Sequence, residues 1–205
     1  MLKKRKMFVL IGAITLMAGL LSGCSAAHMT AKQLESAFAG ISVNIRTFDE
    51  ESQVIDNVNG ESVMVERDTT FDTSTSEGSN KDSSVLKITI GEHEMHHVGS
   101  SLVMAEDGLY DIFGEYAKTV DINNTDRSIP IINSIVNSFK NVTSGKEKTI
   151  LIRSQNGTPL ATYVGNKVSI FSVDIPKTTA FLVDNKVLLV YRCDYTVYDT
   201  ALLLD

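Results

Sequence analysis

Alternating hydrophobic and polar positions dominate the chain from Ile41 onward, and they predict a mostly β protein. Short apolar stretches with a period of two predict strands, and turn-rich stretches separate them. In the first half the predicted strands are Val43–Ile45, Val63–Val65, Val85–Ile90 and Ser101–Met104. In the second half they are Thr149–Arg153, Leu160–Val164, Lys167–Phe171, Thr179–Val183 and Val187–Tyr198. Residues 68–84 are rich in Thr, Ser, Asp and Asn and predict an exposed loop.

Two helices interrupt this pattern. A short one begins at Thr30, which can form a capping box with Gln33, and Gly40 can end it. The second is amphipathic, with Ser128 as its cap and Pro130 in its first turn. Its apolar stripe consists of Ile131, Ile132, Ile135, Val136 and Phe139. Helical spacing of these residues predicts that the stripe packs on one or both sheets.

The strand blocks on either side of the second helix resemble each other. Residues 42–47 (SVNIRT) read like residues 149–154 (TILIRS) when Ile45-Arg46 is set on Ile152-Arg153, and Gly60 then matches Gly165 after a shorter turn. We interpret this as an internal duplication. The alternative is that any two amphipathic β meanders look alike at this level. The predicted fold is therefore α+β, mostly β: two related antiparallel β-meander units joined by an amphipathic helix, after a short N-terminal helix.

The N-terminus has the pattern of a bacterial lipoprotein signal peptide. Basic residues 3–6 precede an apolar run from Met7 to Leu21, which is shorter than the roughly 20 residues of a spanning helix. Ser22 and Gly23 are the small residues expected before a cleavage site, and Cys24 follows them directly. A plain secretory signal would not require that cysteine. We expect diacylglycerol on Cys24, and two acyl chains suffice for stable anchoring.

These segments divide the chain into five parts. Residues 1–23 are the predicted signal peptide and residues 24–29 a lipid tether. Residues 30–110 hold the short helix and the first β unit, 111–148 the connecting segment with its helix, and 149–205 the second β unit. The folded part is thus expected close to the membrane, on its extracytoplasmic face.

Removal of the signal peptide makes the chain strongly acidic. Four of the 19 Lys and Arg residues lie in residues 1–23 and none of the 25 Asp and Glu residues does, so 15 basic residues remain and the formal charge is −10. An acidic surface is repelled by nucleic acid and by anionic lipid headgroups. No nucleic-acid partner is expected, and the lipid bilayer is expected to be contacted through the acylated Cys24.

One cluster could bind a metal. His93, His96 and His97 lie within five residues, beside two glutamates. In a strand, however, His93 and His97 point one way and His96 the other, and the first two are about 13 Å apart. We therefore favour an edge strand with solvated side chains over a metal site.

Other chemistry has little support in the sequence. Cys193 shares a predicted strand face with Val187, Leu189, Tyr191 and Tyr195 and is interpreted as a small buried hydrophobic residue. The chain has no Gly-x-Ser-x-Gly elbow and no phosphate-binding glycine loop after a strand. It also has no Trp for a sugar-binding platform. No catalytic residue and no cofactor are expected.

The chain resembles a set of uncharacterised lipoproteins of low-GC Gram-positive bacteria that carry a domain of unknown function. The resemblance rests on the cysteine motif followed by a short helix, on residues 85–91 (VLKITIG) running to residues 97–102 (HVGSSL), and on residues 106–109 (EDGL). It implies a source and a compartment but no mechanism.

The expected function is that of a membrane-anchored surface lipoprotein. We expect a non-catalytic interaction or structural module at the boundary of membrane and cell wall, with a membrane or cell-wall protein as a possible partner. A small-ligand or solute receptor is the first alternative, although the two α/β lobes usual in such receptors do not fit this chain. A hydrolase acting on the cell wall is the second.

Overall fold

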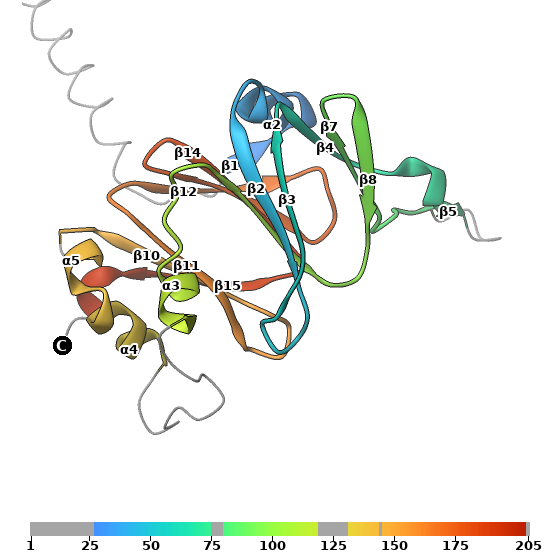
Figure 1. Ribbon diagram of the computed structural model, residues 1–205. Helices are drawn as coiled ribbons and strands as arrows, with labels where there is room; N and C mark the ends of the chain where they lie inside the picture. The colour runs from blue at the N-terminus through green and yellow to red at the C-terminus, as the bar shows by residue number, and fades with distance from the viewer. Residues whose placement is uncertain (1–26, 75–79, 119–130, 144, 204–205) are drawn as a thin grey trace, which may run out of the picture.

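A seven-stranded sheet forms the centre of the protein in the computed structural model (Figure 1), which describes residues 27–74, 80–118, 131–143 and 145–203. Its strand order is β1-β12-β13-β14-β9-β2-β3. The strands are β1 (Ala27–Met29), β2 (Ser42–Phe48), β3 (Val54–Glu61), β9 (Ser101–Glu106), β12 (Val168–Val173), β13 (Thr178–Val183) and β14 (Lys186–Tyr191). All neighbours are antiparallel except β1 and β12.

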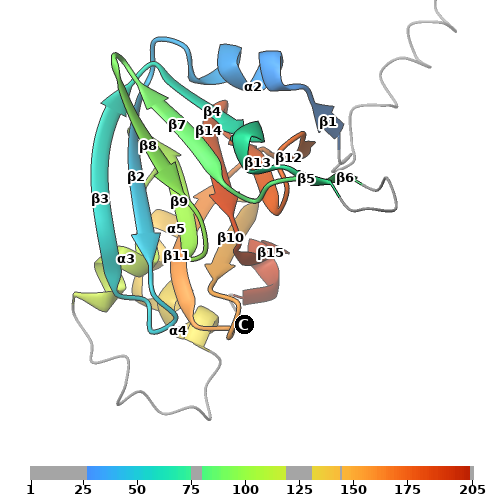
Figure 2. The same ribbon diagram turned by 90° about the vertical axis from the view of Figure 1, so that its right-hand side faces the viewer.

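Two three-stranded antiparallel sheets cover the central sheet. One has the order β4-β7-β8, with β4 (Val63–Arg67), β7 (Leu86–Ile90) and β8 (His93–His97). The other has the order β11-β10-β15, with β10 (Lys148–Arg153), β11 (Pro159–Gly165) and β15 (Asp194–Asp199). Figure 2 shows β7 and β8 in front of the central strands and the β10–β11 sheet behind and below them. The fold is α+β and mostly β, as the sequence predicts.

The alternation in β9 and β14 explains how the central sheet is buried on both faces. Leu102 and Met104 belong to the apolar core shared with β4, β7 and helix α2 (Ala31–Phe38). Val103 and Ala105 point the other way, into the core shared with β10 and β11. A strand buried on both faces reads as a continuous apolar run, which is what both strands show.

The helices lie at opposite ends of this stack. The first, α2, has the predicted capping box between Thr30 and Gln33, and Gly40 follows its end with φ = +72°. The others, α3 (Ile112–Ala117), α4 (Ile131–Ser138), α5 (Lys140–Thr143) and the 3-10 turn η3 (Thr200–Leu203), gather beside the β11-β10-β15 sheet. Ile135 and Val136 of α4 pack against Leu151 there, so the predicted stripe packs on one sheet. The predicted cap and first turn, Ser128 and Pro130, fall outside the described residues.

The two strand blocks are not two separate meanders, and this part of the sequence prediction is wrong. Each block is split between two sheets. In the first block, β2 pairs with β3 and β9, while β4, β7 and β8 form the other sheet. In the second, β10 pairs with β11 and β15, while β12, β13 and β14 form the other sheet. The blocks also share the central sheet, because β9 pairs with β14.

The two blocks have the same pairings in the same register. The pair Val43–Gly60 between β2 and β3 corresponds to Lys148–Gly165 between β10 and β11, a shift of 105 residues on both strands. Each hairpin has one irregularity, after Thr47 and after Ile152, again 105 residues apart. We call residues 42–106 the first repeat and residues 148–199 the second.

The hairpin turns agree as well. The Asp49 N–H donates to the Gln53 carbonyl at 3.0 Å, and the Ser154 N–H donates to the Thr158 carbonyl at 2.8 Å. The sequence alignment, which placed Arg46 on Arg153, is therefore off by two residues: Arg46 corresponds to Leu151, and no gap is needed before Gly60. From β7 and β13 onward, equivalent residues are 93 positions apart instead of 105. The first repeat is longer here because residues 68–85 contain an insertion that the second repeat lacks.

Three further differences from the sequence prediction are local. Residues 27–29, predicted as tether, form β1 against β12. The predicted strand Val187–Tyr198 breaks at Arg192, where φ is +52°, and the chain passes from the central sheet into the β11-β10-β15 sheet. The predicted loop 68–84 contains a 3-10 turn, Thr69–Phe71, and a pair of two-residue strands, β5 (Thr73–Ser74) and β6 (Asn80–Lys81).

Candidate functional site

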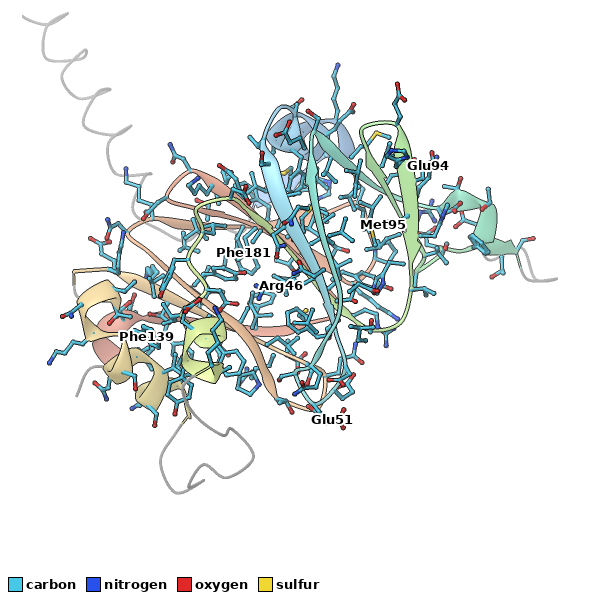
Figure 3. The ribbon with its side chains drawn as sticks, in the orientation of Figure 1. Arg46, Glu51, Glu94, Met95, Phe139 and Phe181 are labelled. Carbon is cyan, nitrogen blue, oxygen red and sulfur yellow. The ribbon has the colours of Figure 1, made fainter. Side chains whose placement is uncertain are left out.

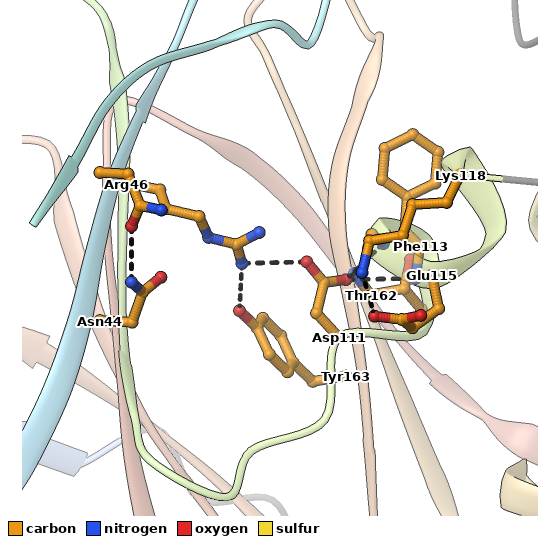
Figure 4. Close-up of polar contacts among 10 residues, drawn as sticks. Asn44, Arg46, Asp111, Phe113, Glu115, Lys118, Thr162 and Tyr163 are labelled. Atoms are coloured by element: carbon orange, nitrogen blue, oxygen red, sulfur yellow. Dashed lines mark hydrogen bonds and ion pairs between the residues drawn. The ribbon is translucent and has the colours of Figure 1, made fainter. Parts of the chain in front are cut away.

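A part-buried ion pair joins Arg46 of the first repeat to Asp111 of the connecting segment, beside Tyr163 of the second repeat. Arg46 lies on β2, Asp111 caps the N-terminus of α3, and Tyr163 lies on β11. One guanidinium nitrogen of Arg46 donates to Asp111 Oδ2 at 2.9 Å and to the Tyr163 hydroxyl at 2.9 Å. Figure 3 places Arg46 at the middle of the molecule, and Figure 4 shows one nitrogen of its head group joined by dashed lines to the carboxylate and to the phenol.

The Asp111 carboxylate is held from several sides. Its Oδ1 accepts the backbone N–H groups of Phe113 and Gly114 at 3.1 Å each, which is the cap of α3. The same atom accepts the Thr162 N–H of β11 at 3.0 Å. One carboxylate thereby joins a strand of the first repeat, the connecting helix and a strand of the second repeat.

Burial and charge act against each other in this cluster. Desolvation disfavours the Arg46 cation, but the neighbouring Tyr163 and Asp111 outweigh it and raise the pKa of Arg46. Desolvation is also the main reason why the pKa of Tyr163 is raised, with the Asp111 charge adding to it. The tyrosine is 1% exposed. It therefore stays protonated at neutral pH, and we call Arg46, Asp111 and Tyr163 the clasp, because their hydrogen bonds join β2, α3 and β11.

The histidines are not brought together. His93 is exposed at the start of β8. His96 is exposed on the opposite face of that strand, and its Nε2 lies 3.0 Å from Asp68 Oδ2. His97 is buried, with Nε2 2.9 Å from the Ser100 carbonyl and its ring edge-on to Tyr191. The predicted alternation is confirmed: in Figure 3, Met95, which packs on the core, and Glu94 leave the strand on opposite sides. The prediction that all three histidines are solvated is wrong for His97.

Among the described residues there is no group of three or more His, Cys, Asp or Glu side chains placed to bind one metal ion. Asp68, the partner of His96, already accepts hydrogen bonds from the hydroxyl and N–H of Thr70, which lower the pKa of its carboxyl. Asp68 thus caps the 3-10 turn Thr69–Phe71. His28 is similarly engaged, by Asp174 at 3.1 Å and Ser172 at 3.1 Å.

A groove of about 870 Å³ opens beside the β12–β13 turn and the break at Arg192. Its charged lining mixes both signs: Asp82, Asp174, Asp194, Lys177 and Arg192. Lys177 (φ = +60°) and Arg192 (φ = +52°) are joined by a backbone hydrogen bond of 2.9 Å. The Nε of Arg192 is buried and has no hydrogen-bond partner within the described part of the chain.

Cys193 also lines this groove, half-buried. Burial is the main reason why the pKa of its thiol is raised to about 12. A thiol with that pKa is protonated at neutral pH and is a poor nucleophile. The interpretation as a small buried hydrophobic residue holds in part: Cys193 packs against the core, but it lies at the break and not in a strand with Tyr191.

A family model described as a domain of unknown function, DUF5052, matches residues 4–203. The chain belongs to the DUF5052 family. No curated protein and no solved structure matches it. The match extends over both repeats, the connecting helices and most of the N-terminal segment, so the DUF5052 domain includes the whole described fold.

The sequence of this DUF5052 protein does not reveal its clasp. Arg46, Asp111 and Tyr163 are separated by 65 and 52 positions, and no local spacing links them. The one local signal was Asp111, a typical N-cap residue before an apolar helical turn. The groove cannot be predicted from the sequence either, because it is formed where the chain changes sheets at Arg192.

Proposed function

We propose that this DUF5052 protein is a lipid-anchored lipoprotein of a low-GC Gram-positive bacterium, acting as a non-catalytic interaction or structural module at the boundary of membrane and cell wall. The observation that carries the proposal is that the side chains best suited to chemistry are engaged in structural contacts. Arg46, Asp111 and Tyr163 form the clasp, His97 caps a turn, and the Cys193 thiol has a raised pKa.

The place of β1 supports the anchoring part of the proposal. Only Ser25 and Ala26 separate Cys24 from Ala27, which is already paired with Phe171 of β12. Three residues reach at most about 10 Å. A lipid on Cys24 would hold the central sheet directly at the bilayer surface. None of the helices in the described ranges is both long and apolar enough to cross a membrane.

A duplicated scaffold supports the structural part. We infer that the two repeats are related units, because their four strand pairings and the hairpin turns agree in register. Duplication gives a rigid body with repeated surfaces, and it gives no catalytic centre by itself.

Metabolic labelling tests the anchor. Cells that express the full chain are fed a fatty acid carrying a detectable tag, and the protein is recovered and probed for the tag. We expect label in the wild type and in Cys193→Ser, and none in Cys24→Ala. Label that persists in Cys24→Ala, or is absent from the wild type, contradicts the proposal.

The groove favours a second candidate function, the binding of a small polar ligand. Its lining carries both charge signs, so the cations Lys177 and Arg192 could pair with the carboxylate of a ligand and the aspartates with its ammonium group. Thermal unfolding of the full chain in the presence of a panel of free amino acids tests this candidate. A saturable rise in the melting temperature that is lost in Arg192→Gln would favour a receptor over a purely structural module.

A further inference from the structure

The two repeats are joined by one strand pairing, between β9 and β14. Its register places Ala105 opposite Leu188, Met104 opposite Leu189, Val103 opposite Val190 and Leu102 opposite Tyr191. In this junction a strand from the end of the first repeat meets the fifth strand of the second repeat. The sheet continues without interruption from β12 to β3.

Each of these strands has an equivalent in the other repeat. A shift of 93 residues carries β8 onto β14, because Ile88 pairs with Met95 as Phe181 pairs with Leu188. The same shift carries β9 onto β15, because both make the same pairing with the first strand of their repeat. Of the strands that the structure describes, β8 ends the β4-β7-β8 sheet and β15 ends the β11-β10-β15 sheet. A pairing of β8 with β15 would be equivalent to the pairing of β14 with β9, but it is not formed between these strands of one chain.

We propose that β8 of one chain pairs with β15 of a second copy, as β14 pairs with β9 within the chain. The equivalent register is antiparallel and places Met95 opposite Tyr198, His96 opposite Val197, and His97 opposite Thr196. Val98 then faces Tyr195. Backbone groups on a free sheet edge are unpaired and available for such a strand addition.

Exposed apolar side chains lie where this pairing needs them. Val98 is 59% exposed and Tyr195 is 36% exposed. They occupy the positions of Tyr191 and Leu102, which are both fully buried at the junction within the chain. The pairing would cover the exposed parts of both side chains, and it would again place an aromatic ring opposite an aliphatic side chain; Tyr195 would keep its edge-on contact with Phe181.

The polar end of the junction also has a counterpart. Within the chain, Glu106 accepts the Val187 N–H at 2.8 Å and pairs with Lys186 Nζ at 3.2 Å. The equivalent of the acid Glu106 is Asp199, and the equivalent of the base Lys186 is His93. Both equivalents are exposed. An acid on β15 and a base on β8 therefore recur at the two edges, although Asp199 also pairs with Lys148 of its own chain and lies opposite Glu94 in this register.

The proposed contact is heterologous, since β8 and β15 are different surfaces of one chain. Each copy would still offer one free β8 and one free β15 after pairing, so the assembly extends to a ring or a row of copies. The proposal concerns the folded domain and does not depend on lipidation or on the absence of catalysis.

Disulfide trapping between two tagged chains tests the proposal. Both full-length chains carry Cys193→Ser, one also carries Val98→Cys, and the other carries Tyr195→Cys. They are expressed together, and intact cells are treated with a mild oxidant. The control replaces Val98→Cys by Val54→Cys, because Val54 is 48% exposed on the edge strand β3. Melting temperatures close to the wild type show that each variant folds.

We expect a Val98–Tyr195 product containing both tags, several-fold more abundant than the Val54–Tyr195 product. Adding His93→Asp should lower that yield, since it would add a second carboxylate next to Glu94, which lies opposite Asp199 of the second copy in this register, and Asp199→Lys in the partner should restore it. Equal yields for Val98 and Val54, or a product made only of Val98–Val98 pairs, would overturn the proposal.

Discussion

Gly60 and Gly165 occupy the same position in the two repeats. Each glycine pairs with an equivalent residue on the first strand of its hairpin: Gly60 with Val43 of β2, and Gly165 with Lys148 of β10. At each, a side chain from the next sheet fills the space of a Cβ. A Cβ on Gly60 would collide with Ile90, and one on Gly165 would lie 2.7 Å from Cγ1 of Val183. Ile90 and Val183 are themselves equivalent residues.

This close approach predicts that alanine is destabilising at both glycines. Gly60→Ala and Gly165→Ala should each lower the free energy of unfolding by about 1–3 kcal/mol, the usual cost of overpacking. Because the colliding atom belongs to a side chain, shortening that side chain should relieve the clash. We expect Gly165→Ala combined with Val183→Ala to cost less than the sum of the single variants in denaturant titrations. Additive costs would contradict the account of the close approach.

The clasp predicts an uneven response to removal of its members. Arg46→Met leaves the Asp111 carboxylate, whose side chain is 13% exposed, without its cation. We expect a loss of about 3 kcal/mol, the low end of the range for breaking a buried pair, because three backbone N–H groups still hold Asp111. Tyr163→Phe removes one hydrogen bond and should cost about 1 kcal/mol.

A matched control for the clasp is Lys118→Met on α3. Lys118 pairs with Glu115 at 2.6 Å, but its side chain is 69% exposed. Removal of this exposed pair should leave the free energy of unfolding essentially unchanged, because exposed ion pairs contribute little. If Arg46→Met were as mild as Lys118→Met in the same denaturant titration, the clasp would not join the two repeats.

The packing of α4 predicts a strong effect of a buried charge. Ile135 is fully buried against the β11-β10-β15 sheet. Ile135→Asp should lose roughly 1.5–3 kcal/mol of side-chain burial, with a further cost for the desolvated carboxylate. The denaturation midpoint should fall visibly, while Asn137→Asp on the exposed face should leave it unchanged. A wild-type midpoint for Ile135→Asp would mean that α4 is kept for a partner.

The different burial of the histidines predicts that their replacement by alanine affects stability to different extents. His93→Ala changes an exposed side chain and should alter stability by less than about 0.5 kcal/mol. His97→Ala removes a buried ring that contacts Ser100 and Tyr191, and it should cost about 1–3 kcal/mol. Zinc or nickel should leave the melting temperature of the wild type unchanged. A saturable rise that disappears in the combined His93→Ala and His96→Ala variant would establish a metal site and refute this reading.

The sequence predicted best where local pattern and tertiary burial agree. The apolar runs that became β9, β10, β11 and β14 are strands buried on at least one face, and the Thr30–Gln33 capping box is present as expected. β3 was missed because it is an exposed edge strand with hardly any buried position. β1 was missed because three residues paired with a distant strand carry no periodicity of their own.

The register of the repeats and the candidate site depend on long-range contacts. An arginine in both segments suggested the alignment of Arg46 with Arg153, but pairing sets Arg46 on Leu151. The alternation of apolar and polar residues continues across Arg192, so the sequence gives no sign that the strand ends there. The break becomes visible only in the structure, where the chain passes from one sheet to another. The clasp joins residues far apart in the chain, and no sequence spacing could predict it.

The mass of the mature N-terminal peptide tests the lipid anchor at the centre of this account most directly. The protein is extracted from membranes with detergent, digested, and its N-terminal peptide is measured by mass spectrometry. We predict a peptide that begins at Cys24 and carries a diacylglyceryl group on its sulfur, with residues 1–23 removed. A peptide with an unmodified Cys24, or a chain that still begins at Met1, would contradict the account.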